Sequence, residues 1–255
     1  FSLLGILLAF MLTKWQWHWP LAIIAVLTAS ALMGLVHGLL VTKVRIQPFI
    51  VTLCGLLLYR GIARYISDDQ TQGLGYCAGF EGLQQFLTGN LLRIPFTQVY
   101  IPMTFAILAV IGFVMWVVLH RSVYGRYLFA VGRNEEATRY AGINTHRVII
   151  GSYVIATLLA GISAILLVFY TNSVSPSSHG NFYELYAIAA AVLGGCSLRG
   201  GEGSVPGVVI GITLILVLRN LVNLLGIPSS LDFAVLGIVI LLGVVIDQLL
   251  KRKRA

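Results

Sequence analysis

Charged residues are scarce in this chain of 255 residues: only 10% are Asp, Glu, Lys or Arg, whereas 58% are hydrophobic. A soluble domain carries about 25% charged residues, so this composition, with a mean hydropathy of +0.92, argues against a soluble enzyme. Intrinsic disorder is excluded as well, because disordered chains combine low hydrophobicity with high charge. We therefore expect an all-α polytopic integral membrane protein, whose net charge of +8 reports orientation in the bilayer and no nucleic-acid partner.

Motifs of catalysis and of metal or nucleotide binding are also missing. The three cysteines show neither a zinc-ligand spacing nor the even count of a disulfide framework. No lysine follows a glycine, which excludes a phosphate-binding loop, and no two of the five histidines form a His-Glu-x-x-His pair. Gly201-Glu202-Gly203 matches a dinucleotide fingerprint only in part and does not follow a predicted strand. We expect no catalytic residue, no metal site and no cofactor.

Apolar runs alternate with short polar loops along the chain. The hydrocarbon core of a bilayer is about 30 Å thick and a helix rises about 1.5 Å per residue, so one span needs about 20 apolar residues. The sequence predicts about eight transmembrane segments, at 1–13, 19–40, 48–66, 98–119, 147–170, 185–198, 204–222 and 230–249. They form a single transmembrane domain over 1–255. The first begins without Met inside an apolar run, so we expect an N-terminally truncated chain.

Basic residues predict the orientation. Cytoplasmic loops are enriched in Lys and Arg, and a run of four basic residues at 251–254 follows the last segment. If this run is cytoplasmic, the arginine-rich loop 120–146 is also cytoplasmic only when the short segment 185–198 crosses the membrane. We therefore predict that 185–198 crosses among other helices, that the C-terminus is cytoplasmic, and that the loop 67–97 is extracytoplasmic. This topology places the whole positive excess inside.

The loop 120–146 carries the signals of a short helix. Asn134 is a favourable N-cap, and Glu135 and Glu136 place negative charge in the first turn. Arg139 lies near the end, and Gly142 favours the left-handed conformation that stops a helix. A short helix that exposes charges of both signs between two spans is suited to docking onto another protein. A surface helix without a partner would show the same signals.

Glycines are concentrated near the C-terminal spans. Gly203, Gly207 and Gly211 recur every four residues and line one face of a predicted helix, which lets another helix approach closely. Gly34 and Gly38 form a smaller face of this kind. Adjacent glycines also permit a sharp break that a transporter uses as a hinge. We assign hinge or packing roles to Gly194, Gly195, Gly200, Gly201, Gly203, Gly207 and Gly211.

Polar residues inside apolar segments are costly in lipid and mark candidate pathways. Glu184, Asn220 and Asn223 lie near the predicted outer ends of the last spans, and we assign them to a translocation path. His37, next to Gly38 near an inner end, is interpreted as a packed or interfacial histidine.

Three stretches carry a family resemblance: 41–53, the loop 125–142, and Glu184-Leu185 with the alanine-rich run that leads into Gly194-Gly195. Together they resemble the permease subunits of ribose-type sugar ABC importers. The resemblance implies a channel-forming subunit in the bacterial inner membrane that transports a ribose-like monosaccharide. It further implies a second permease subunit, a separate ATP-binding subunit and an extracytoplasmic sugar-binding protein. The chain departs from the family pattern at His37, where Asn is usual, and at Gln47, where a second Pro is usual.

The resemblance also implies a role for the predicted short helix. It would be the coupling helix that sits in a cleft of the ATPase, and closure of two ATPases would move it as a rigid body. The residues carried over to it by position are Asn134, Glu135, Ala137, Thr138, Arg139 and Gly142.

Other functions stay open at this point. A branched-chain amino acid permease shares the general plan. A membrane-embedded enzyme would need acid and base groups within hydrogen-bond reach of each other, and no helical spacing here supplies them. A self-contained secondary transporter would be indicated by an inverted repeat, which we do not find.

Overall fold

The computed structural model describes residues 1–75, 81–93 and 100–226, with residues 231, 234, 237, 238 and 241 further on. Contacts within the chain divide it into two compact units. Unit 1 consists of Phe1–Ile111 and Asn144–Asn181, and unit 2 of Gly112–Ile143 and Phe182–Ala255. Apart from those five positions, the predicted segment 230–249 lies outside the described residues, as does the basic run 251–254.

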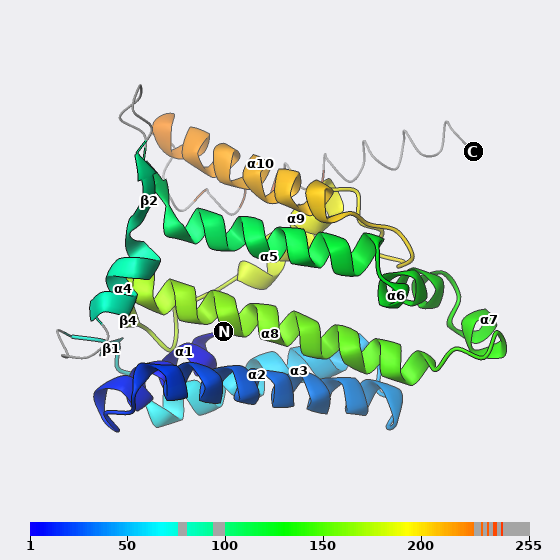
Figure 1. The fold of residues 1–255 in the computed structure, drawn as a ribbon, viewed down its shortest axis with the longest axis horizontal. Coiled ribbons are helices and arrows are strands. Elements are labelled where there is room, and N and C mark those ends of the chain that lie inside the picture. Colours follow the sequence, from blue (N-terminus) through cyan, green and yellow to red (C-terminus); the bar gives the residue numbers. More distant parts are fainter. Residues whose placement is uncertain are drawn as a thin grey trace. The chain divides into compact units, whose positions relative to one another are not determined.

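Helices make up most of both units (Figure 1). The helices of unit 1 are α1 (Ser2–Thr13), α2 (Trp19–Thr42), α3 (Pro48–Ile66), α4 (Glu81–Thr88) and α8 (Thr145–Thr171). Those of unit 2 are α6 (Val123–Arg133), α7 (Glu135–Tyr140), α9 (Tyr183–Leu193) and α10 (Val205–Leu224), and α5 (Met103–His120) runs from unit 1 into unit 2. Two short antiparallel strand pairs join loop segments. The strand β1 (Gln72–Gly73) pairs with β4 (Ser173–Val174), and β2 (Asn90–Arg93) pairs with β3 (Tyr100–Pro102).

Five helices in the described part of the chain are long and apolar enough to cross a membrane: α2, α3, α5, α8 and α10. The prediction of an all-α membrane protein is thus confirmed, with five candidate spans among the described residues. The predicted number of about eight is not shown, because most of the segment 230–249 lies outside the described residues. The predicted segments 1–13 and 185–198 form only the shorter apolar helices α1 and α9. At about 1.5 Å per residue, α9 does not reach across a hydrocarbon core of about 30 Å as a straight helix.

The predicted helix at 185–198 is wrong at its C-terminal end, because α9 stops at Leu193. Gly195 takes a left-handed φ of 84°. Its N–H donates to the carbonyl of Val192 at 2.9 Å, and the N–H of Cys196 donates to that of Ala191 at 2.9 Å. These two bonds form a Schellman motif, which satisfies the last carbonyls of the helix and turns the chain away. Apolar composition alone did not reveal this stop.

The main packing in unit 1 is between α2 and α8, which lie side by side in Figure 1. The buried positions of α2 recur every four residues: Ala22, Val26, Ser30, Gly34, Gly38 and Thr42. Cβ atoms added at Gly34 and Gly38 would lie 2.8 Å from Val154 Cα and 2.9 Å from Ile150 Cα. Because these contacts are with backbone atoms, the close approach predicted at the two glycines is confirmed, and its partner is α8.

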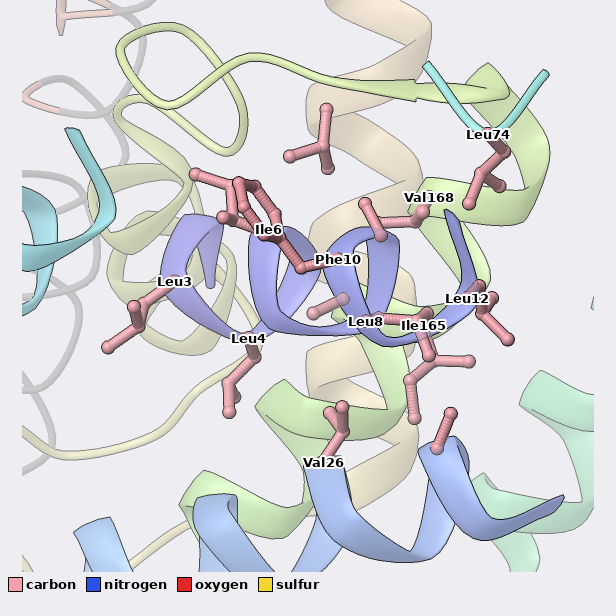
Figure 2. Packing of buried hydrophobic residues seen from close by; sticks show 14 of the residues in the cluster. Leu3, Leu4, Ile6, Leu8, Phe10, Leu12, Val26, Leu74, Ile165 and Val168 are labelled. Carbon is pink, nitrogen blue, oxygen red and sulfur yellow. The ribbon is translucent and has the colours of Figure 1, made fainter. Parts of the chain in front are cut away.

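The core of unit 1 is built around α1. Figure 2 shows the apolar side chains of α1 pointing to several sides, in one cluster with Val26 of α2, Leu74, and Ile165 and Val168 of α8. A helix that is hydrophobic on all faces belongs in an interior. The helix α1 therefore packs inside unit 1.

His179 lies beside this core, in the loop that follows β4. Its ring centroid is 6.2 Å from that of Phe1, and its Nε2 atom is buried without a hydrogen-bond partner among the described residues. Burial lowers the pKa of His179 from its usual 6.5, because the imidazolium ion loses hydration. Below about pH 6.5 the unfolded chain therefore binds a proton that the folded chain resists, so acid reduces stability.

We expect the melting temperature of the detergent-solubilised protein to fall between about pH 7 and about pH 5, and to fall less in His179→Asn, which does not titrate there. The matched control is His18→Asn, since His18 is exposed. Thermal melts of the three proteins across this range check the prediction. An identical pH dependence in the parent and His179→Asn would contradict it.

Candidate functional site

The short helix expected in the loop 120–146 is present as α7. The side-chain Oδ1 of Asn134 accepts a hydrogen bond from the N–H of Ala137 at 3.0 Å, and Thr138 Oγ1 donates to the carbonyl of Asn134 at 2.7 Å. Gly142, just beyond the helix, has a φ of 82°. The first turn is therefore capped by a side chain, and the chain leaves the helix through a residue that tolerates the left-handed conformation.

A second helix in the same loop, α6, was not predicted from the sequence. Ser122 caps it by accepting a hydrogen bond from the N–H of Gly125 at 3.1 Å. A Cβ added at Gly125 would lie 2.7 Å from the carbonyl oxygen of Val118, so glycine allows α6 to fold back against the end of α5. The signal in the sequence was Ser122 with a glycine three residues later, which resembles a turn as much as a helix start.

The side chains of α7 are exposed except that of Thr138, which is buried. Glu135, Ala137 and Arg139 therefore share a surface with Tyr140, which is 81% exposed. The guanidinium carbon of Arg139 lies 5.9 Å from the centre of the Tyr140 ring. Tyrosine and arginine supply much of the binding energy in protein interfaces. Sequence reasoning missed Tyr140, although an aromatic residue at the end of a charged helix was a visible signal.

In unit 2, glycines allow α9 and α10 to pack closely against each other. A Cβ added at Gly207 would lie 3.1 Å from the carbonyl carbon of Gly194, and one added at Gly211 would lie 3.0 Å from that of Ala190. The two helices thus meet backbone to backbone. Since Gly194 faces Gly207 while the earlier Ala190 faces the later Gly211, α9 and α10 run antiparallel.

The link between α9 and α10 is a compact turn with internal hydrogen bonds. The N–H of Ser197 donates to the carbonyl of Glu202 at 3.1 Å, and the N–H of Gly200 donates to the carbonyl of Ser197 at 3.1 Å. Gly200 and Gly201 have φ values of 89° and 78°, which glycine adopts without steric cost. A Cβ added at Gly203 would lie 2.9 Å from Cys196 Sγ.

The three residues assigned to a translocation path share one end of the α9 and α10 pair. Glu184 lies in the first turn of α9, and Asn220 and Asn223 lie in the last turns of α10. All three are exposed. The guanidinium carbon of Arg219 lies 5.3 Å from the centre of the Tyr186 ring, which brings the same two helix ends together.

His37 belongs to an aromatic cluster of unit 1. Its Nε2 atom lies 3.3 Å from the hydroxyl oxygen of Tyr59, and its ring centroid lies 6.5 Å from that of Tyr153. Gly55 leaves room for the imidazole, since an added Cβ there would lie 2.9 Å from His37 Cε1. These contacts agree with the interpretation of His37 as a packed residue. Within the described ranges, no three His, Cys, Asp or Glu residues gather to hold a metal ion.

The chain matches a protein family over residues 1–244, and the family is described as "Branched-chain amino acid transport system / permease component". It is 38% identical over 227 residues to the ribose import permease protein RbsC of Escherichia coli (strain K12), which covers 89% of this chain and 68% of that protein. It is 40% identical over 213 residues to RbsC of Bacillus subtilis (strain 168), and the matched part covers 83% of this chain and 63% of that protein.

A third relative is the galactose/methyl galactoside import permease protein MglC of Haemophilus influenzae, 32% identical over 236 residues, or 92% of this chain and 68% of that protein. No solved structure matches. The chain thus spans about two thirds of the length of these relatives. With five candidate membrane spans in the part of the chain that the structure describes, an apolar composition and these matches, the chain belongs to the family of sugar ABC importer permeases, the non-catalytic membrane subunits of such importers.

Proposed function

We propose that this chain forms, with a second permease subunit, the membrane channel of an importer that takes up a ribose-like monosaccharide from an extracytoplasmic binding protein. The identity of 38–40% to ribose import permeases over most of the chain carries this proposal. Other relatives are named for fructose and galactose, which supports monosaccharides as the substrate class. The two units are parts of one permease domain.

The helix α7 is the coupling helix that docks onto a separate ATPase subunit. Three properties support this role: side-chain caps, a nearly fully exposed surface, and the adjacent Arg139 and Tyr140. A short helix whose cap bonds fix its shape moves as one piece when its partner moves. Glu135, Arg139 and Tyr140 contact the ATPase, while Thr138 holds α7 to its own N-cap.

The loop 120–146 and the C-terminus lie on the cytoplasmic side of a bacterial inner membrane, and α9 completes its crossing together with the glycine-rich link that follows it. The arginines of α6 and α7 support this orientation, because positive residues favour the cytoplasmic side. Glu184, Asn220 and Asn223 then lie toward the opposite side, where a binding protein releases its sugar. Their exposed polar groups offer hydrogen bonds to sugar hydroxyls, and the glycines 194–211 permit the path to open.

Tyr140→Ala tests the docking role. We expect it to release the ATPase subunit and to reduce ribose uptake by about 30-fold, since truncation of an interface hot spot costs about 2 kcal/mol or more. The measurement is copurification of the ATPase together with uptake of labelled ribose into proteoliposomes that contain the complete importer. Tyr65→Ala is the matched control, because Tyr65 is 85% exposed at the end of α3 in unit 1.

The same assay tests the substrate class. The description of the matching family favours branched-chain amino acids as a second candidate. We expect unlabelled ribose to compete with labelled ribose and leucine to have no effect. Uptake of leucine in place of ribose would overturn the sugar assignment, and full ATPase binding by Tyr140→Ala would overturn the docking role.

A further inference from the structure

The helix α6 and the turn between α9 and α10 touch through three glycines. A Cβ added at Gly132 would lie 3.0 Å from Gly201 Cα and 3.2 Å from the carbonyl carbon of Gly200, and closer still to the N atom of Gly201. From the other side, a Cβ added at Gly200 would lie 2.8 Å from the carbonyl oxygen of Gly132. All three residues belong to unit 2. The backbone of Gly132 therefore lies directly on the backbone of Gly200 and Gly201, and the side chain of Arg133 packs beside Gly201.

The close contact requires glycine at position 132, whereas the backbone conformation there does not. It lies inside α6 and has an ordinary helical φ, unlike Gly200 and Gly201. Glycine inside a helix costs about 1 kcal/mol relative to alanine. Alanine would thus suit α6 better at this position, and only the approach of the turn 200–201 excludes it.

Short rigid connections lie on both sides of the contact. Asn134, two residues after Gly132, ends α6 through its N–H to the carbonyl of Ala130 at 3.1 Å and also caps α7. The turn is closed by its own hydrogen bonds, and Ser204, three residues after Gly201, caps α10 by accepting from the N–H of Gly207 at 3.1 Å. Few freely rotating backbone bonds therefore lie between α7 and the start of α10, so a displacement of α7 is passed on to α10.

We propose that Gly132 is a positioning residue for transport: its contact with Gly200 and Gly201 transmits movement of α7 to the α9 and α10 pair. A flexible side chain at the contact would absorb the displacement, whereas close-packed backbone passes it on. The pair moved in this way carries Glu184, Asn220 and Asn223 at its far end. The inference rests on the proposed docking role of α7.

Gly132→Ala in the complete, full-length importer in proteoliposomes tests the inference. The quantity is the number of ATP molecules hydrolysed per ribose taken up. We expect this ratio to rise by about 5-fold or more, the lower end of usual coupling between sites, while ATPase copurification and binding-protein-stimulated hydrolysis stay within about twofold of the parent. Gly112→Ala is the control: it lies in a helix of the same unit, and an added Cβ meets no atom of the described residues within 4 Å.

A second variant acts on the contact from the turn. Gly200→Asn adds a side chain toward Gly132, and Gly226→Asn is its control, since Gly226 has a φ of 68° and a Cβ added there meets none of the described residues within 4 Å. If the importer that carries Gly132→Ala does not assemble, the number of ATP molecules hydrolysed per ribose in the importer that carries Gly200→Asn tests the inference. Failure of both to assemble, or an unchanged ratio in assembled complexes, overturns the inference. An unchanged ratio alongside loss of docking in Tyr140→Ala leaves the proposed function standing, whereas normal docking in Tyr140→Ala removes the docking role of α7 on which the inference rests.

Discussion

Gly34→Ala is expected to prevent α2 and α8 from packing and to lower the melting temperature of the detergent-solubilised protein by about 5–10 °C, or to abolish folding. The added Cβ would lie 2.8 Å from both the carbonyl oxygen of Tyr153 and Val154 Cα, and closer still to Thr157 Oγ1. Two of these atoms are backbone, so the helices must separate. That separation also breaks the hydrogen bond from Ser30 Oγ to the carbonyl of Thr157. Thermal melts measure the loss.

Two further variants make this result specific. Gly61→Ala places the same methyl group in α3 of the same unit, where an added Cβ meets none of the residues that the structure describes within 4 Å, and helix propensity favours it. Its melting temperature should equal or exceed that of the parent. Adding Thr157→Ala to Gly34→Ala removes the clash with a side chain but leaves the backbone clashes, so we expect no rescue. Full rescue would show that the backbone approach is not limiting.

Gly211→Ala is expected to detach α9 from α10. The added Cβ would lie 3.0 Å from the carbonyl carbon of Ala190 and 3.1 Å from the N atom of Gly194. In the described part of unit 2, α9 packs chiefly on α10, and the small core there consists of Ala189, Ala190 and Ile215 with a few neighbours. Without close approach this core opens, and limited proteolysis should cut at the link 194–203.

The control for Gly211→Ala is again Gly112→Ala, which adds a methyl group to open space in the same unit. It should leave the rate of proteolysis unchanged. Ala190→Gly would not rescue Gly211→Ala, since the clash is with backbone atoms of residue 190. Equal protease resistance in Gly211→Ala and the parent would contradict the expected tight contact between the helices.

Much of the fold was predictable because local patterns specify it. Long apolar runs predicted α2, α3, α5, α8 and α10 close to their observed bounds. The error falls on α9, whose composition resembles that of a span but which is shorter than the predicted segment 185–198. α1 is covered on all sides inside unit 1, and Gly195 stops α9 early. Composition cannot distinguish an interior helix from a lipid-facing one, because both are apolar.

The candidate site, like the fold, could be predicted from local patterns only in part. Asn134 and Gly142 predicted α7 through cap chemistry, which needs only neighbouring residues. The helix α6 was missed because Gly125 weakens the helical pattern, and its fit against the end of α5 emerges only in three dimensions. The exposure of Tyr140 was missed for a related reason, since an aromatic residue in a mostly apolar chain is more often buried or in lipid.

Composition and helix caps act over a few neighbouring residues, and they were enough to predict a membrane protein and a capped helix after Asn134. The packing in three dimensions was needed to show that Gly34 meets α8, that Gly211 meets α9, and that Gly132 lies against the turn 200–201. A glycine in the sequence shows that close approach is allowed. The approaching partner depends on contacts between segments far apart in the chain, which no local pattern encodes.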